Sequence, residues 1–140
     1  MSHKSGKIAE LIDHLKGRGH DPHYLGYFEC FNRQLFYEAH DVLEELWLVC
    51  RGTKRDGFYK ALIQLAGAFV HLQKGRIAPA GKLFRLSRSY FVRYPAEFES
   101  LSVTAVVHLI DDWHGILAAD NFTRNPLTPE RTPHLPLPAE

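Results

Sequence analysis

The chain has 140 residues, 45% of them hydrophobic and 24% charged, which is the composition of one globular domain with a substantial core. A formal net charge of +1 argues against a nucleic-acid-binding protein, and no run of uncharged apolar residues is long enough for a membrane span. Two cysteines are too few for a disulfide framework, and the first residues do not resemble a secretion signal, so we expect a cytoplasmic protein.

Apolar residues recur at helical spacing in several segments that are separated by turn residues. The first predicted helix ends before Gly17 and Gly19. The second begins at Asp21 and Pro22, because aspartate can cap free N–H groups and proline suits the first helical turn. We expect an interruption near Asn32. The remaining helices are predicted at residues 35–50, 58–74, 79–94 and 103–119.

These elements predict an all-α fold, a single antiparallel bundle of five to six helices over residues 1–120. Residues 121–140 form a Pro-rich C-terminal tail, since five prolines in this range prevent a helix. The tail is either mobile or an extended arm on a neighbouring surface. Its leucines, which favour the second interpretation, are Leu127, Leu135 and Leu137.

Two polar residues of the helix at 35–50 are directed toward its apolar side. His40 lies within the apolar stripe and Glu44 lies on its shoulder, so they form an i, i+4 pair facing the interior. The stripe itself consists of Phe36, Leu43, Trp47 and Cys50. The carboxylates on the opposite side, which we interpret as a solvated face, are Glu38, Asp41 and Glu45.

The helix at 58–74 carries two polar exceptions in an otherwise apolar run, Gln64 and His71, which share one face. The short turn before it makes the two helices antiparallel neighbours. Counting outward from this turn places Glu44 near Gln64 and His40 near His71. The predicted polar cluster comprises Glu38, His40, Glu44, Gln64 and His71, where Glu38 joins only if the start of its helix is distorted.

Three kinds of chemistry are compatible with this cluster. The favoured one is a buried hydrogen-bond network that fixes helix register, with no catalytic residue assigned. The second is a divalent metal site, in which His40, Glu44 and His71 are the ligands and Gln64 orients them; an open coordination position would permit a metal-dependent hydrolase. The third is metal-free acid–base catalysis by His40 or His71 with Glu44.

The helix at 79–94 offers a contrasting class of function, because aromatic and basic residues alternate along it. The aromatic members are Phe84, Tyr90, Phe91 and Tyr94, and the basic members are Lys82, Arg85, Arg88 and Arg93. We interpret this segment as an amphipathic helix with a charged outer face rather than a nucleic-acid surface, given the near-neutral chain. A helical domain with an apolar tail could also form a homo-oligomer through a two-fold interface.

The central motifs resemble a family of small bacterial and archaeal helical proteins, the domain of unknown function DUF309. The resemblance rests on Phe31-Asn32, Phe36-x-Glu38-x-His40-Asp41-x-Leu43-Glu44-x-x-Trp47, Leu62-Ile63-Gln64-x-Ala66 and His71, within about residues 28–86. This chain departs from the family pattern at Asp41, Arg76 and Pro79, where glutamate, asparagine and glycine are usual. The resemblance implies an all-α bundle and no reaction. We therefore predict a structural or protein-interaction module, with a metal-binding protein or hydrolase as the alternative.

Overall fold

The computed structural model describes residues 3–139, with the backbone alone for residues 3–5. Its elements are α1 (His3–Ile12), the 3₁₀ helix η1 (Asp13–Leu15), α2 (Pro22–Asn32), α3 (Phe36–Cys50), α4 (Asp56–Gln73), α5 (Ile77–Phe91), β1 (Glu97–Phe98), β2 (Leu101–Ser102) and α6 (Val103–Ala119). The prediction of a mostly helical fold is confirmed, but the small sheet was not predicted. None of the helices within residues 3–139 combines the length and the apolar character that a membrane crossing requires.

Local capping explains where several helices begin and end. The Asp21 carboxylate accepts a hydrogen bond from the backbone N–H of His23, which satisfies a free donor at the start of α2. Gln34 then adopts a φ of 66°, a left-handed conformation that stops the helix and turns the chain into α3. Ser102 caps α6 in the same way as Asp21 caps α2, by accepting from the N–H of Ala105.

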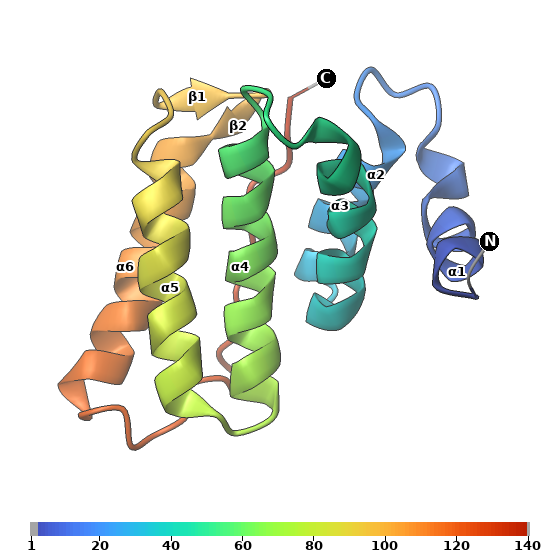
Figure 1. Ribbon diagram of the computed structural model, residues 1–140. Helices are drawn as coiled ribbons and strands as arrows, with labels where there is room; N and C mark the ends of the chain where they lie inside the picture. The colour runs from blue at the N-terminus through green and yellow to red at the C-terminus, as the bar shows by residue number, and fades with distance from the viewer. Residues whose placement is uncertain (1–2, 140) are drawn as a thin grey trace.

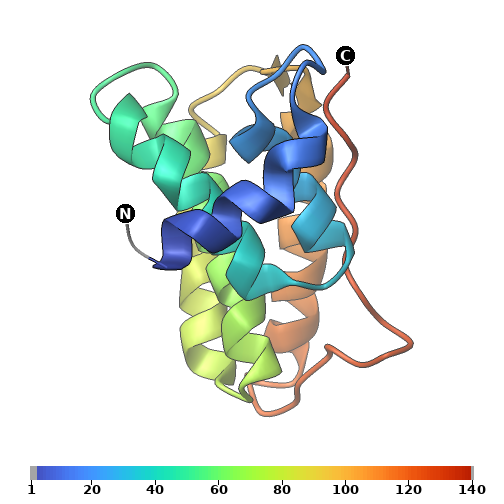
Figure 2. The ribbon, with the colours of Figure 1, turned by 90° about the vertical axis from the view of Figure 1, so that its right-hand side faces the viewer.

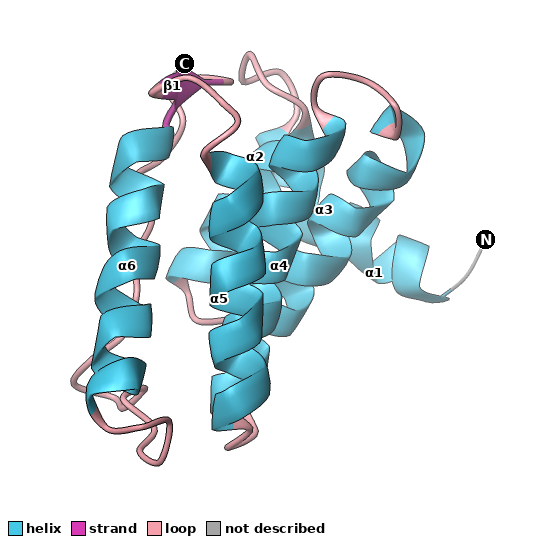
Figure 3. Cartoon of the chain, turned by 60° about the vertical axis from the view of Figure 1, so that its left-hand side comes forward, coloured by secondary structure: helices cyan, strands magenta, loops and turns pink. Residues whose placement is uncertain are grey.

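The core is built around α4, which packs against α3 on one side and α5 on the other (Figure 1), with α6 next to α5 (Figure 3). Phe69 of α4 shows how closely the helices converge. Its ring lies 5.5, 5.0, 5.1 and 5.0 Å from the rings of Phe31, Phe36, Phe84 and Trp113, respectively. These four rings belong to α2, α3, α5 and α6, so one fully buried side chain joins most of the domain.

The N-terminal helix covers the outer side of α2 and α3 through a second, smaller apolar cluster (Figure 2). Ile8, Ile12 and Leu15 pack there with Val42 of α3. Gly26 of α2 permits this approach, because a Cβ atom at that position would lie 2.5 Å from Cγ2 of Ile12. The side of α3 that the sequence assigned to solvent is therefore partly covered.

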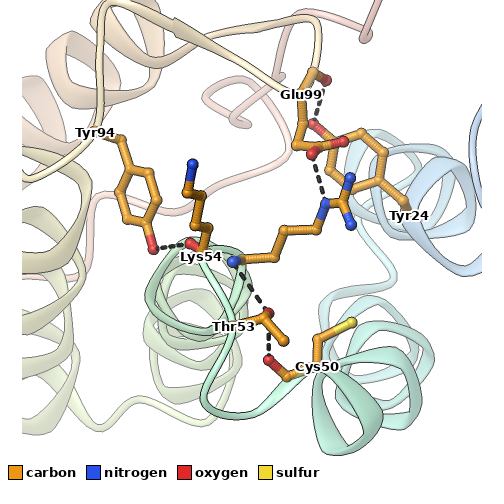
Figure 4. A network of polar contacts seen from close by, with 7 residues as sticks. Tyr24, Cys50, Thr53, Lys54, Tyr94 and Glu99 are labelled. Atoms are coloured by element: carbon orange, nitrogen blue, oxygen red, sulfur yellow. Dashed lines mark hydrogen bonds and ion pairs between the residues drawn. The ribbon is translucent and has the colours of Figure 1, made fainter.

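The two short strands form a hairpin with a two-residue turn at Glu99 and Ser100, whose φ angles are 51° and 60°. Two successive positive φ angles are typical of a type I′ turn, which usually contains glycine or asparagine. Contacts from distant elements hold the turn instead (Figure 4): the Tyr24 hydroxyl donates to the Glu99 carbonyl (2.9 Å), and Arg55 Nε donates to its carboxylate (2.6 Å). Because the turn contains neither glycine nor asparagine, a hairpin was not predicted at these residues.

The C-terminal segment, residues 121–139, runs along the helices as an extended strap (Figure 2). Leu135 is buried within the main apolar core. Hydrogen bonds join the strap to successive elements, pairing Asn125 with Leu72, Pro133 with Gln34, Leu135 with Asn32, and Ala139 with both Ser100 and His20. The strap thus spans the domain from the end of α4 to the hairpin.

Candidate functional site

Contacts at both ends of α3 and α4 define how these two helices lie together. Phe36 at the start of α3 stacks on Phe69 near the end of α4, with centroids 5.0 Å apart. At the other end, the Trp47 indole N–H donates to the Asp56 carboxylate over 2.8 Å. The two helices therefore run in opposite directions.

The ring of His40 contacts carboxylates of its own helix. Its Nδ1 lies 3.2 Å from Oδ1 of Asp41, and its Nε2 lies 3.9 Å from Oε2 of Glu44. The side chains of His40 and Glu44 are 32% and 33% exposed, whereas that of Asp41 is 17% exposed. The expected division into an interior pair and a solvated Asp41 does not describe this geometry, because the Asp41 side chain is less exposed than those of His40 and Glu44.

Gln64 and His71 lie in α4 with one polar atom each shielded from solvent. Gln64 Oε1 and His71 Nδ1 are buried and have no hydrogen-bond partner among the described residues. Burial lowers the pKa of His71 below its ordinary value, and the nearby cations Arg76 and Lys74 lower it further. The ring of His71 is therefore neutral near pH 7, so it could donate or accept a hydrogen bond or bind a metal ion.

Glu38 occupies a different environment from the other members of the predicted cluster. Its carboxylate interacts with the thiol of Cys30 in α2. Burial raises the pKa of Cys30 to about 11, with smaller contributions from Glu29 and Glu38. Cys30 is thus a protonated, unreactive core side chain near pH 7.

The arrangement of these side chains bears on metal binding. Within the part of the chain that the structure describes, no group of three or more His, Cys, Asp or Glu side chains is placed to hold a metal ion. His40 and Glu44 approach each other within one helix, whereas the buried nitrogen of His71 has no partner. The ligand set of His40, Glu44 and His71 therefore stays a prediction from sequence.

Asp56 organises the turn between α3 and α4, a role that the sequence analysis did not assign. Its two carboxylate oxygens accept from the Trp47 indole and from the backbone N–H of Gly52, each over 2.8 Å. The Gly52 bond and then the Trp47 bond lower the pKa of Asp56. Thr53 closes the same turn by donating to the Cys50 carbonyl (Figure 4). The feature of the sequence that could have indicated this role is the position of an acidic residue, Asp56, close to the start of the helix predicted at residues 58–74.

Exposed apolar residues, together with exposed or partly exposed charged residues, form two faces on the helices that flank α4. The α3 face consists of Tyr37, Asp41, Glu44 and Leu48, spaced to lie on one side of the helix, with Tyr37 57% and Leu48 49% exposed. The α5 face consists of Lys82, Arg85 and Leu86, all exposed. One face is acidic and apolar, and the other is basic and apolar.

The alternating aromatic and basic residues of this segment do not form one continuous surface. Phe84 and Phe91 are fully buried because they face the core. Arg88 is paired with Asp111 of α6, with 2.7 Å between Nε and Oδ1. Tyr90, Tyr94 and Arg93 remain at the surface, and they lie toward the start of α4 rather than along an open basic helix.

These features define a small, mostly helical domain in which α3 and α4 lie side by side. Residues 24–83, which include α3 and α4, match the family described as Domain of unknown function (DUF309), so the predicted resemblance is confirmed over this part of the chain. No curated protein and no solved structure matches the chain. The family description names no activity.

Proposed function

We propose that the protein is a non-catalytic interaction module of the cytoplasm, an antiparallel helical bundle that pairs with a second copy of itself. The observation that supports this most directly is the complementarity of the α3 and α5 faces. Both carry exposed leucines, Leu48 and Leu86, which are 49% and 45% exposed. Acidic residues accompany the first leucine and basic residues accompany the second.

If the two-fold axis of the dimer passed over α4, both faces of each copy would lie in the interface. Each α3 face would then lie against the α5 face of the other copy, which is the self-complementary contact of a closed dimer. Tyr37, Leu48 and Leu86 would supply the apolar centre, where most of the binding energy arises. The charges of Lys82 and Arg85 opposite the acidic α3 face would favour this orientation more than they would add affinity.

In this proposal the polar cluster supports the module rather than a reaction. The contacts of His40 with Asp41 and Glu44 stay within α3, so they stabilise the helix that presents the α3 face. We also propose that the Pro-rich strap is a tail distinct from the bundle of residues 1–120. It would lie outside the surface formed by the α3 and α5 faces. Metal binding by His40, Glu44 and His71 remains the alternative prediction, and elemental analysis tests it.

Sedimentation equilibrium of the full chain tests the proposal over micromolar to submillimolar concentrations. We expect a reversible dimer. Leu48→Arg should make the protein monomeric, because it places a cation against the basic α5 face of the partner. Adding Arg85→Glu to Leu48→Arg should restore the dimer by reversing one of the opposing charges.

The matched control is Leu137→Arg, which introduces the same charge at a leucine that is 68% exposed on the strap. It should leave the dimer intact, and all variants should keep the helical circular dichroism of the wild type. A wild-type chain that stays monomeric over the whole concentration range contradicts the proposal. So does equal loss of the dimer in Leu48→Arg and Leu137→Arg.

A further inference from the structure

A groove lies between the first turn of α4, the end of α5 and strand β1, on a different part of the surface from the polar cluster. Its volume is about 470 Å³, within the range of small-molecule sites. Three cationic side chains and three aromatic rings contribute to its lining, namely Lys54, Lys60, Arg93, Tyr90, Tyr94 and Phe98. Since these residues come from segments some 40 positions apart, the groove could not be recognised from the sequence.

Aromatic rings hold two of the cations in place. The ammonium of Lys60 lies 5.3 Å from the centroid of Tyr90 and 5.7 Å from that of Trp47. The guanidinium of Arg93 lies 4.9 Å from the centroid of the same Tyr90 ring. Cation–π contacts of this length restrict side chains that would otherwise be free in solvent. Tyr90 thus keeps two positive groups beside one groove.

The single carboxylate that lines the groove is already engaged. Both oxygens of Asp56 accept hydrogen bonds, from the Trp47 indole and from the Gly52 N–H. Its charge is therefore directed toward the α3–α4 turn, while Lys54, Lys60 and Arg93 outnumber it in the groove. Cations held close together repel one another, and an anionic ligand would relieve that repulsion.

The wall next to the cations is apolar and fixed. Tyr94 and Phe98 have ring centroids 4.8 Å apart, and the Tyr94 hydroxyl donates to the Lys54 carbonyl over 2.7 Å. Gly57 allows this position of Tyr94, because a Cβ atom there would lie 2.9 Å from the hydroxyl oxygen. Lys54 consequently lies beside the Tyr94 ring (Figure 4). A flat group could stack on this wall next to the positive charges.

We propose that this groove binds a small phosphate ester that carries a flat ring, of the size of a nucleoside monophosphate. Lys54, Lys60 and Arg93 bind the phosphate, and Tyr94 with Phe98 contacts the ring. A free nucleotide fits better than a nucleic-acid strand, because a chain with a net charge of +1 provides little basic surface beyond the groove for further phosphates. This proposal does not rest on the proposed pairing through the α3 and α5 faces.

Isothermal titration calorimetry of the full chain with adenosine 5′-monophosphate tests the proposal. We expect saturable binding, and binding of adenosine or inorganic phosphate alone that is weaker by about tenfold or more, since each probe lacks one half of the recognised group. Lys54→Gln and Arg93→Gln should each raise Kd about tenfold through loss of a charge-assisted contact. Both side chains are exposed, so the melting temperature should not change.

Arg33→Gln is the matched control, because Arg33 is an exposed arginine directly after the end of α2 that does not line the groove. It should leave Kd unchanged. No measurable binding of the monophosphate overturns the proposal, and so does an equal effect of Arg33→Gln and Arg93→Gln. If inorganic phosphate binds as tightly as the monophosphate, the proposed contact of Tyr94 and Phe98 with the ring is wrong. If single-stranded oligoadenylate binds more tightly than the monophosphate, the ligand of the groove is nucleic acid rather than a free nucleotide.

Discussion

The two halves of α4 differ in whether their polar side chains have interaction partners. At its first turns, Asp56 has a hydrogen-bond donor at each carboxylate oxygen, and Lys60 lies against two aromatic rings. Further along, Gln64 Oε1 and His71 Nδ1 are buried with no partner among the described residues. Specific contacts thus hold the charged groups of the first half in place at the surface. The buried polar atoms of the second half, which lack such contacts, lower the stability of the fold. A sequence pattern of polar residues in an apolar helix does not distinguish these two situations.

Trp47 should show the largest effect, because it supports the well-partnered half. Trp47→Ala removes the bond to Asp56, the ring beside Lys60 and apolar packing against the core, and should lower the free energy of unfolding by about 2–4 kcal/mol. Urea denaturation followed by circular dichroism measures this loss. Trp47→Phe keeps a ring and should lose only about 1 kcal/mol. Equal losses in the two variants would show that packing makes no separate contribution.

Gln64 tests the other half of α4 in the opposite direction. Gln64→Leu removes the buried Oε1, which has no partner among the described residues, and keeps a side chain of similar size, so it should raise the free energy of unfolding by about 1 kcal/mol. The same denaturation experiment measures the gain. Gln73→Leu is the control, because Gln73 is exposed and donates to the Gln34 carbonyl, and it should give no gain. A destabilised Gln64→Leu variant would mean that the amide has a partner in solution.

His71 should produce a smaller, pH-dependent effect. Its pKa in the folded protein is lowered, so the unfolded chain binds a proton more readily as pH falls through about 6.5. The contribution of His71 to stability is therefore complete above that pH and is lost on acidification. We expect the melting temperature to fall between pH 7.5 and 5.5, and to fall less in His71→Gln.

The cations near His71 provide a second test of the same effect. Replacing Lys74 and Arg76 with glutamine removes two charges that disfavour protonation, and both side chains are exposed. This double variant should also show a shallower dependence of melting temperature on pH than the wild type. If His71→Gln and the wild type have the same pH dependence, the burial of His71 does not influence its protonation.

The smallest expected effect concerns metal. Tag-free protein purified without chelator should contain no stoichiometric metal by elemental mass spectrometry, and a chelator should not change its melting temperature. His40→Ala should change the free energy of unfolding by less than about 1 kcal/mol, because a third of the His40 side chain is exposed. One zinc, iron, manganese or nickel per chain, lost in both His40→Ala and His71→Ala, would instead support the metal-binding alternative.

Elements that depend on local signals could be predicted from the sequence. Asp21 and Pro22 marked the start of α2, and the apolar spacing from Val103 gave the bounds of α6. The motifs around His40 and Gln64 led to the DUF309 family. In each case the information lies within a few neighbouring residues, through capping geometry, helical periodicity or a short motif.

Features that join distant segments could not be predicted. The turn at Glu99 contains no glycine, and it depends on Tyr24 and Arg55 from other parts of the chain. Val42 is buried against residues of α1, a contact that the helical pattern of α3 alone does not specify. Similarly, the groove requires Lys54 and Arg93 to meet after two helices have formed. Tertiary packing decides all three.

The strap of residues 121–139 has a consequence for local unfolding. The N–H of Leu135 is bonded to Asn32 Oδ1 and that of Ala139 to the Ser100 carbonyl, so neither amide reaches solvent unless the strap lifts. If the segment detaches as one unit, both amides should exchange their hydrogens at a common opening free energy, lower than that of amides in α4. The strap would then form a cooperative unit of its own, opening and closing while the helices beneath it remain folded.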